Sequence, residues 1–342
     1  MRQEIEKIAT VEQNGHATTE PGYVAAVDLG GTNLRLALAD MSGTILTRWS
    51  SSTVGLHGPE AVIQLLCTGT KRMLREVATL PDALRSIAIG VPGITDVDNG
   101  IVIAASYLMG WRDVPLRALV ERELNVTVFV DNDVNMAAMG EQWSGMAKNA
   151  KDFVFLAIGT GIGAGIVLNG RLHRGSSWAA GEIGYMLVPG AAKIPATSDE
   201  PGALESMIGG EGIKAQWQEL RSREPAAPST EFNATEIFDR AVEGNTDAQA
   251  LFCQSATMLA QAIYNIWLVL NCPLFVLGGT VGMHSALCEA AQKMLNQWIV
   301  QGSPRLVRST LGTDAQLLGS IRAALETAQA SIVPSAICAN SD

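Results

Sequence analysis

The sequence YVAAVDLGGTNLRLALADMSGTILTRWS, residues 23–50, decides the fold class. It contains an apolar run, a turn at Asp28–Thr32, the alternating run NLRLALAD, a turn at Asp40–Gly43 and a third run. Alternating apolar and polar residues between glycine-rich turns are typical of β-hairpins. We therefore expect three consecutive strands joined by tight turns.

A second stretch, DFVFLAIGTGIGAGIVLNGRLHRG at residues 152–175, has the same pattern. It is an apolar run, a glycine-rich turn, a second apolar run and a hairpin turn at Asn169-Gly170. The order of strand, small-residue turn and strand is repeated with little residue identity. This indicates a weak internal duplication.

Apolar residues at helical spacing predict helices, and short apolar runs predict buried strands. The predicted helices are 58–79, 115–124, 133–147, 234–271, 284–300 and 314–329, and the further predicted strands are 86–93, 100–106, 126–131 and 274–279. Residues 189–203 and 221–231 are rich in proline and small residues, which predicts surface loops. Strands that alternate with helices indicate an α/β protein.

Composition limits the class of protein further. A chain of 342 residues suggests about two domains. Its 47% hydrophobic and 17% charged residues exclude a disordered chain. The net charge is −10 and lysine and arginine form no run, so we expect no nucleic-acid partner.

The cysteines and the apolar segments indicate a compartment. Five cysteines lie far apart without CxxC spacing, which argues against a disulfide framework and favours a reducing cytoplasm. The N-terminus has no apolar core of a signal peptide. The most apolar helical stretch, 256–270, is shorter than the ~20 residues that a membrane span needs. We therefore expect a cytoplasmic protein without membrane contact.

The two glycine-rich turns are candidate phosphate sites. Small residues let backbone N–H groups approach an anion closely. Gly30, Gly31 and Thr32 form the first such turn, and Gly159, Thr160 and Gly161 form the second. Asp28, just before the first turn, could hold Mg²⁺ directly or through water. The alternative is that both are ordinary tight turns.

Residues 159–164 also match the dinucleotide pattern GxGxxG/A, with Glu182 at the distance of its ribose-binding acid. That pattern requires a helix after the glycines. Here Ile166–Leu168 and a hairpin turn follow, which indicates a strand. The chain also has no GxxxxGK[ST] motif of a P-loop NTPase.

Three polar residues follow a predicted buried strand at Asp131, Asn132 and Asp133. Strand ends at this edge of an α/β sheet carry functional sites. Asp133 could act as general base toward a substrate hydroxyl, oriented by Asn132. The alternative is that Asp131 or Asp133 caps a helix.

Glu182 in AAGEIGY and Glu205 in PGALES are isolated acids among small residues. Carboxylates that accept pairs of sugar hydroxyls suit such positions. The alternative is that each is an ordinary surface acid.

Taken in order, these motifs resemble the ROK family of sugar kinases and repressors, in the actin-like ATPase superfamily, over about residues 23–328. The matching segments are DLGGTNLRLAL, GVPGITDVDNGIV, GWRDVPLRALVERELNVTVFVDNDVNMAAMGE, IGTGIGAGIVLNGRLHRGSSWAAGEIG, GALES, VLGGTVGMH and LGTDAQLLGSIRAAL. The resemblance implies two actin-like, ribonuclease H-like α/β domains, with mixed sheets flanked by helices and a cleft between them.

The resemblance also implies domain boundaries. They are a flexible tail at 1–22, a small domain at 23–130 completed by the returning helix 314–329, a larger domain at 131–313, and a tail at 330–342. A homodimer or tetramer is expected by the same resemblance.

The resemblance also implies a role for each position of this chain that matches a site residue of the family. Asp133 would be the catalytic base. The sugar would be bound by Gly93, Asn132, Glu182, Tyr185 and Glu205. The ATP would be bound by Asp28, Gly30, Gly31, Thr32, Asn33, Gly159, Thr160, Gly161, Gly278 and Gly279, with Mg²⁺ carried by ATP near Asp28.

The chain departs from the family at its structural zinc site. The common pattern has a histidine three residues after the Glu182 position and then a cluster of cysteines. Here that position is Tyr185, and residues 190–204 contain no cysteine. Because zinc sites of this kind use thiolates and imidazole, we expect no structural zinc, and the identity of the sugar stays open.

The resemblance therefore implies ATP-dependent phosphorylation of a hexose, glucose or a related sugar, at the 6-hydroxyl. The alternative is a catalytically silent sugar sensor or regulator. A dinucleotide-dependent oxidoreductase is the third hypothesis.

Overall fold

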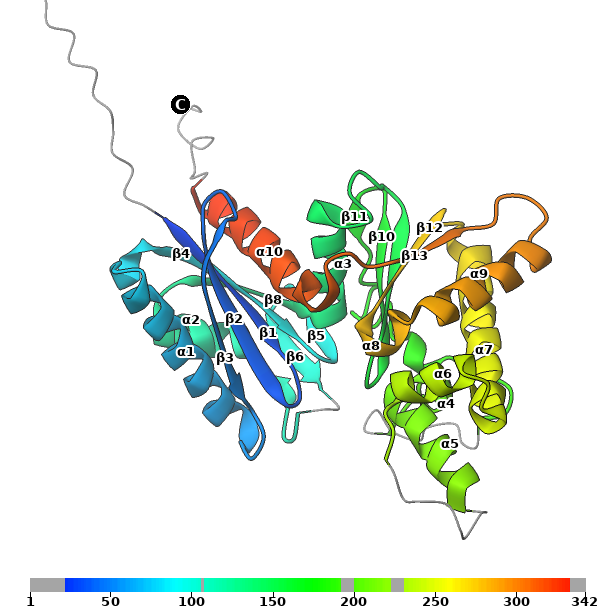
Figure 1. Cartoon of the computed structure of the whole chain (residues 1–342). Coiled ribbons are helices and arrows are strands. Elements are labelled where there is room, and N and C mark those ends of the chain that lie inside the picture. The colour runs from blue at the N-terminus through cyan, green and yellow to red at the C-terminus, as the bar shows by residue number, and fades with distance from the viewer. Residues whose placement is uncertain (1–21, 106–107, 192–199, 223–230, 333–342) are drawn as a thin grey trace, which may run out of the picture.

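The computed structural model describes residues 22–105, 108–191, 200–222 and 231–332. In this part of the chain, two mixed five-stranded sheets stand side by side, each flanked by helices, with a small three-stranded sheet beside the first (Figure 1). This confirms the predicted fold class. The predicted N-terminal tail and the centres of both predicted loops lie outside the described residues.

The first sheet has the strand order β3-β2-β1-β4-β8. Its strands are β1 (Tyr23–Leu29), β2 (Asn33–Asp40), β3 (Ile45–Ser52), β4 (Leu84–Val91) and β8 (Thr127–Asn132). The first three form the antiparallel hairpins predicted from the opening sequence, and β4 and β8 run parallel to β1. The register aligns Asp28 with Gly90 and Gly90 with Asp131. Two strand spacings, about 10 Å, therefore separate the acidic ends of β1 and β8.

Both faces of this sheet are covered. Val27 packs with α1 (Gly58–Glu76) and α2 (Leu116–Leu124) on one face. Its neighbour Ala26 packs with α10 (Ala315–Ile332) on the other. Burial on both sides explains why β1 is a continuous apolar run. Helix α10 also extends three residues past the predicted end at 329.

The small sheet consists of β5 (Ile94–Asp96), β6 (Ile101–Ala104) and β7 (Arg112–Val114). Only the strand at 100–106 was expected, and it is shorter than predicted. The outer two strands have three residues each, too few to produce a recognisable alternation.

The second sheet has the order β11-β10-β9-β12-β13. Its strands are β9 (Phe153–Ile158), β10 (Ile162–Leu168), β11 (Arg171–Leu172), β12 (Leu274–Gly278) and β13 (Arg305–Arg308). As in the first sheet, three antiparallel strands are followed by two strands parallel to the first of them. The predicted duplication is thus present in the topology, although strand β13 was not predicted.

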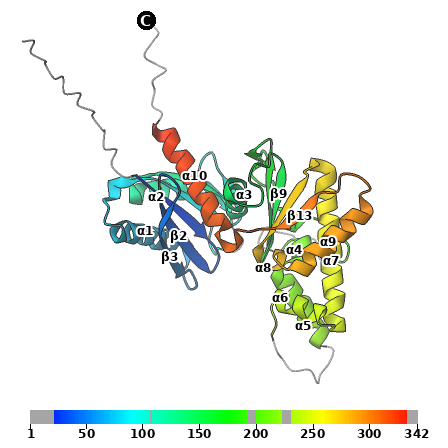
Figure 2. The same cartoon turned by 45° about the horizontal axis from the view of Figure 1, so that its top comes forward.

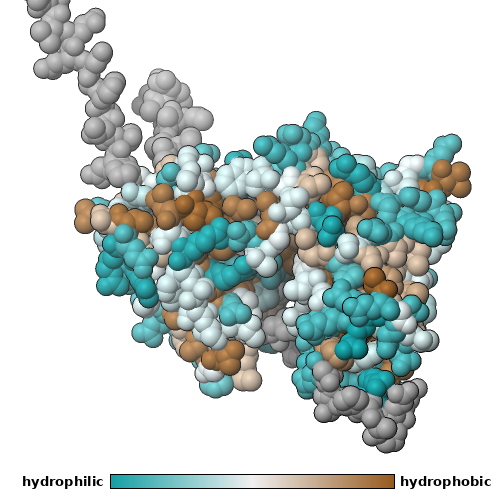
Figure 3. Space-filling model, viewed as in Figure 1, coloured by the Kyte–Doolittle hydropathy of each residue, from teal (hydrophilic) through white to brown (hydrophobic). Residues whose placement is uncertain are grey.

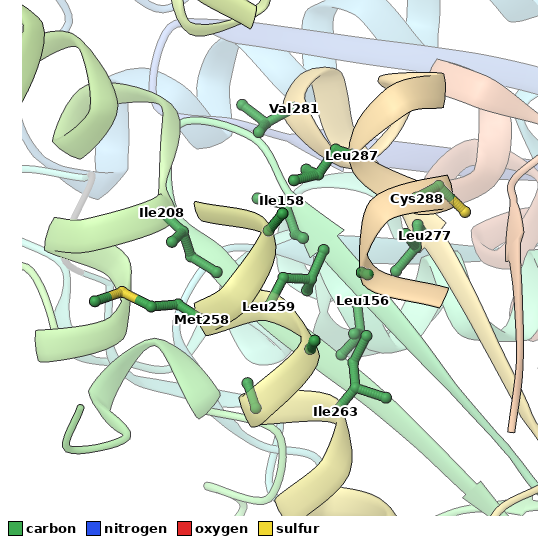
Figure 4. Close-up of a cluster of buried hydrophobic side chains, with 14 of the residues drawn as sticks. Leu156, Ile158, Ile208, Met258, Leu259, Ile263, Leu277, Val281, Leu287 and Cys288 are labelled. Carbon is green, nitrogen blue, oxygen red and sulfur yellow. The ribbon is translucent and has the colours of Figure 1, made fainter. Parts of the chain in front are cut away.

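Six helices, counted within the described residues, lie between β11 and β13. They are α4 (Ala203–Ile208), α5 (Gly210–Ser222), α6 (Ala234–Val242), α7 (Thr246–Leu270), α8 (Gly279–Gly282) and α9 (Ser285–Trp298). The helices predicted at about 234–271 are two, α6 and α7. Gly244 has φ +100°, and Asn245 caps a new helix by accepting the N–H of Ala248 at 2.9 Å. Residues such as Ile158, Leu259 and Val281 from these helices and the sheet form a large apolar core (Figure 4).

Helix α3 (Asp133–Ser144) lies between the two sheets, where it contacts β4, β9, β10 and α10 (Figure 2). It crosses α10 at two glycines. A Cβ on Gly140 would lie 2.2 Å from the carbonyl oxygen of Ala315, and a Cβ on Gly319 would lie 1.7 Å from that of Met136. The two helices therefore approach more closely than any side chain at these positions would permit.

The remaining helical elements among the described residues are 3₁₀ turns at η1 (Pro81–Ala83), η2 (Ile183–Tyr185) and η3 (Gly312–Asp314). No helix in these described ranges is long and apolar enough to cross a membrane. The surface is indented between the parts of the chain that carry the two sheets (Figure 3).

Candidate active site

Asp133 lies where strand β8 ends and helix α3 begins. The helix is capped by Asn132, whose side-chain oxygen accepts the N–H groups of Val134 at 2.8 Å and Asn135 at 3.1 Å. Asp133 is thereby the first helical residue. The alternative that Asp131 or Asp133 caps this helix is wrong.

The carboxyl group of Asp133 holds its proton unusually well. Burial raises its pKa from 3.8 to about 7, and the charges of Asp28 and Glu182 add to the rise. The N–H of Val134, which donates to Oδ1 at 2.9 Å, acts in the opposite direction. A carboxyl group that titrates near the operating pH suits a general base.

Gly93 lies on the other side of Asn132. One N–H of the Asn132 amide donates to the Gly93 carbonyl at 2.9 Å, and an amide nitrogen carries two such donors. Gly93 has φ +92°, and a Cβ there would lie 2.1 Å from the carbonyl oxygen of Ala104. The loop after β4 can therefore take this path only with glycine.

Asp28 is 8% exposed at the end of β1. Its Oδ2 accepts two hydrogen bonds from Arg35, from Nε at 2.7 Å and from Nη2 at 2.5 Å. Burial raises the pKa of Asp28, and Arg35 partly offsets that rise. No described residue donates to Oδ1, so this oxygen is the one that suits a hard cation such as Mg²⁺.

The first glycine turn connects β1 and β2. The N–H of Gly30 donates to the carbonyl of Asn33 at 2.8 Å, and the N–H of Thr53 donates to the carbonyl of Thr32 at 2.9 Å. Gly31, Thr32 and Asn33 are exposed. The N–H groups of Gly31 and Thr32 donate to no residue within the described ranges. Two adjacent donors at an exposed turn are an arrangement that suits an anion.

The second glycine turn connects β9 and β10. The N–H of Gly159 donates to the carbonyl of Gly161 at 3.0 Å, and Gly159 accepts from the N–H of Gly210 at 2.7 Å. Behind the turn, Oε2 of Glu205 accepts the N–H of Ile162 at 2.8 Å. Because β10 is a strand antiparallel to β9, the dinucleotide-binding hypothesis lacks the helix that its fingerprint requires.

Glu182 and Glu205 lie close together. Burial raises the pKa of Glu182, and the neighbouring charge of Glu205 adds to the rise. Gly181, with φ +100°, passes so close to β10 that a Cβ would lie 2.0 Å from the carbonyl oxygen of Ala164. Asp28, Asp133, Glu182 and Glu205 therefore form one group of acids in which each interacts electrostatically with a neighbour.

Tyr185 follows Glu182 by one 3₁₀ turn, and its hydroxyl donates to the carbonyl of Glu200 at 3.4 Å. Residues 190–204 contain neither cysteine nor histidine. Among the described residues, no group of three or more His, Cys, Asp or Glu side chains is arranged to hold a metal ion. The donor set therefore does not fit the structural zinc of the family.

A cavity of about 380 Å³ opens beside the second glycine turn. Its walls are the turn itself (Gly159, Thr160), the first turn of α5 (Gly210, Glu211, Lys214), residues 231–236 at the start of α6, and Thr280 and Val281 of α8. The walls from α5 and α6 were not predicted. The double glycine at 209–210 and the capping box of Asn233 and Glu236 are the sequence signals that mark these two helix starts.

Gly278 and Gly279 pack against β9 behind this cavity. A Cβ on Gly278 would lie 2.4 Å from the ring of Phe155, and one on Gly279 would lie 2.4 Å from the carbonyl oxygen of Ile158. These glycines allow α8 to start directly against the sheet. The cavity wall is then formed by the two residues that follow them.

Comparisons with known proteins agree with this architecture. The model of the ROK family matches residues 24–327. A glucokinase of Halalkalibacterium halodurans is 28% identical over 310 residues, which cover 87% of this chain and 93% of that protein. A xylose repressor of Caldicellulosiruptor bescii is 25% identical over 284 residues, which cover 81% of this chain and 70% of the repressor.

Among solved structures, a ROK family glucokinase of Streptomyces griseus in complex with glucose and AMPPNP has the same fold. Its TM-score is 0.73 at 24% identity, covering 89% of this chain and all of that one. The chain thus belongs to the ROK family, in which it resembles the glucokinases.

Proposed function

We propose that this protein phosphorylates a hexose, glucose or a related sugar, at its 6-hydroxyl with ATP as donor. The observation that carries the proposal is Asp133, a half-buried carboxyl group with a pKa of about 7 beside Asp28 and Glu182. The similarity to glucokinases along nearly the whole chain supports the same reaction.

In the proposed reaction, Asp133 accepts the proton of the attacking sugar hydroxyl while its oxygen bonds to the γ-phosphorus and the bond to ADP breaks. Glu182 and Glu205 accept hydrogen bonds from other hydroxyls of the ring. The second N–H of Asn132 orients the sugar, and Gly93 and Tyr185 complete the site. Holding the hydroxyl in line with the phosphorus supplies a large part of the rate enhancement.

ATP would lie between the two glycine-rich turns, with its adenosine on the side of the second sheet. Its phosphates would meet the N–H groups of the turns at 30–33 and 159–161, and its adenosine would enter the cavity beside Thr280 and Val281. Asp28 would hold Mg²⁺ through Oδ1, and the ion would neutralise charge on the phosphates.

We propose that the two sheets mark two domains, 23–130 with 314–329, and 131–313, which close on the substrates. Closure would exclude water that could otherwise accept the phosphoryl group. The glycine crossing of α3 and α10 lies at the junction of these domains and supports a hinge there.

The test is ADP release, measured with a coupled assay over a panel of hexoses and N-acetylhexosamines. The proposal expects turnover with at least one sugar and its loss in Asp133→Ala. Absence of turnover with every sugar would refute it.

A second candidate is a sugar-binding regulator without catalysis, which the similarity to xylose repressors favours. Calorimetry separates the two functions, because a regulator binds sugar without turning over ATP. A homodimer or tetramer stays a prediction for light scattering to test.

A further inference from the structure

Asp131 is a buried acid that the proposed reaction does not use. It is 1% exposed and lies two residues before Asp133. Its Oδ1 accepts the N–H of Asn132 at 2.7 Å and an amide N–H of Asn135 at 2.9 Å. Its Oδ2 accepts Nε of Arg174 at 2.9 Å and Nη2 of Arg174 at 2.6 Å. Two of these hydrogen bonds fix the carboxylate to the segment that carries the base, and the other two fix it to Arg174.

Arg174 follows β11 of the second sheet, whereas Asp131 belongs to β8 of the first; both strands are labelled in Figure 1. Their ion pair therefore joins the two sheets directly. The Arg174 side chain is 24% exposed, so the pair is largely shielded from water. Shielded charge-assisted hydrogen bonds to arginine define geometry well.

The same arginine begins the loop that carries Glu182. Its carbonyl accepts the N–H of Ala180 at 3.1 Å, which closes the loop 174–180. At the other end, Gly181 accepts the N–H of Ala164 at 2.8 Å. The loop is thus held at Arg174 by Asp131 and at Gly181 by β10, and Glu182 follows directly.

We propose that Arg174 is a positioning residue, which fixes the Glu182 loop against the segment that carries Asp133. This inference rests on the proposed function, because it assigns Glu182 to the sugar and Asp133 to the transferred proton. Through the ion pair, the group that holds the sugar and the group that deprotonates it keep a constant separation. The ATP site is built from other segments, so the pair should influence the sugar and not the nucleotide.

The experiment compares Arg174→Gln, Arg174→Lys, Asp131→Asn and the double variant Arg174→Gln/Asp131→Asn with the wild type. Asp131→Asn keeps the acceptor Oδ1 for Asn132 and Asn135, and it replaces Oδ2, which accepts both bonds from Arg174, with an amide nitrogen that cannot accept them. The matched control is Arg48→Gln, which breaks the Arg48–Asp314 pair, also bidentate with both bonds at 2.9 Å, at an exposed position away from the acids. The readouts are KM for the sugar, KM for ATP, kcat and amide hydrogen exchange of residues 174–182.

We expect kcat/KM for the sugar to fall about 10- to 100-fold in Arg174→Gln, because misplaced reacting groups lower the rate by about that factor. KM for ATP should stay within about twofold, and Arg174→Lys should recover part of the loss, since lysine keeps the charge without the planar fork. The double variant should be no worse than the worse single variant, because both remove one interaction. Hydrogen exchange of the loop should rise in the Arg174 variants and not in the control.

Unchanged kcat/KM for the sugar in Arg174→Gln, even with lower thermal stability, would overturn the inference, because the pair would then be structural only. An equal rise in the KM for the sugar and in the KM for ATP would overturn it too. If Arg174→Gln does not fold, Arg174→Lys and Asp131→Asn decide by the same criteria. A wild type without turnover refutes the proposed function instead. In that case the dissociation constants of the sugar are compared between the wild type and Arg174→Gln, and weaker binding in the variant supports the inference. A wild type that binds no sugar refutes both the proposed function and the inference about Arg174.

Discussion

Replacing Asp133 by asparagine should stabilise the folded protein while it removes the catalytic base. Asparagine has the same shape, keeps the oxygen that accepts the N–H of Val134, and carries no charge. The aspartate, in contrast, ionises in a buried site next to Asp28 and Glu182, which raises its pKa from 3.8 to about 7. Functional groups that are destabilising in the folded state are a common form of the trade-off between stability and activity.

The sign follows from linkage. A carboxyl group with a raised pKa in the folded state favours folding only while it is protonated, so the wild type loses stability as pH rises from 3.8 to about 7. Above pH 7 the full cost, at most about 4 kcal/mol, is present. Because the site is partly exposed, about 2–4 kcal/mol is a realistic range, which corresponds to about 3–6 °C in Tm for a chain of this size.

The assay is thermal unfolding of both proteins at pH 8 and pH 5. Asp133→Asn should raise Tm at pH 8, and at pH 5 the gain should fall below half of that value. Asp40→Asn is the matched control with the opposite sign, since hydrogen bonds from Ser42 and Thr44 lower the pKa of Asp40. An unchanged or lower Tm of Asp133→Asn at pH 8 would show that this carboxyl group is not destabilised by its surroundings.

Three further predictions concern catalysis, the nucleotide site and the junction of the sheets. Because only the deprotonated base accepts a proton, kcat/KM for the sugar should rise with pH and level off above a pKa of about 7; a profile that is flat between pH 5.5 and 8 would contradict this. Gly159→Ala should raise KM for ATP without lowering Tm, because a Cβ there meets no atom within 4 Å; a lower Tm with unchanged KM would mean an ordinary turn. Gly319→Ala should lower the free energy of unfolding by about 2 kcal/mol through overpacking against α3, whereas Gly282→Ala, whose Cβ would meet its nearest atom at 3.5 Å, should leave it nearly unchanged.

The local pattern of the sequence predicted the strands and turns of both hairpin regions because alternation and glycine positions are local properties. The local pattern could not predict the register that aligns Asp28, Gly90 and Asp131, because that alignment depends on the crossovers between parallel strands. Short strands such as β5 and β7 were missed because three residues contain no measurable period.

For the site, too, local features were predicted and long-range contacts were not. Acids at strand ends and between small residues were identified, and the structure brings Asp133 near Asp28 and Glu182. The alternative in which Asp131 or Asp133 caps the helix was wrong, because Asn132 is the cap and the carboxylate of Asp131 pairs with Arg174, which lies 43 residues further along the chain. No local pattern contains that contact. The cavity walls at α5 and α6 were missed for a similar reason, since their helix starts lie far from the glycine turn in sequence.

The most direct test of Asp133 as the catalytic base is a side-by-side measurement of kcat/KM for the preferred hexose in the wild type and Asp133→Asn, with the sugar phosphate detected by mass spectrometry. Loss of a general base should lower this value about 10²- to 10⁴-fold, while Asp133→Asn remains folded. Activity within tenfold of the wild type would contradict the assignment of Asp133 as the base.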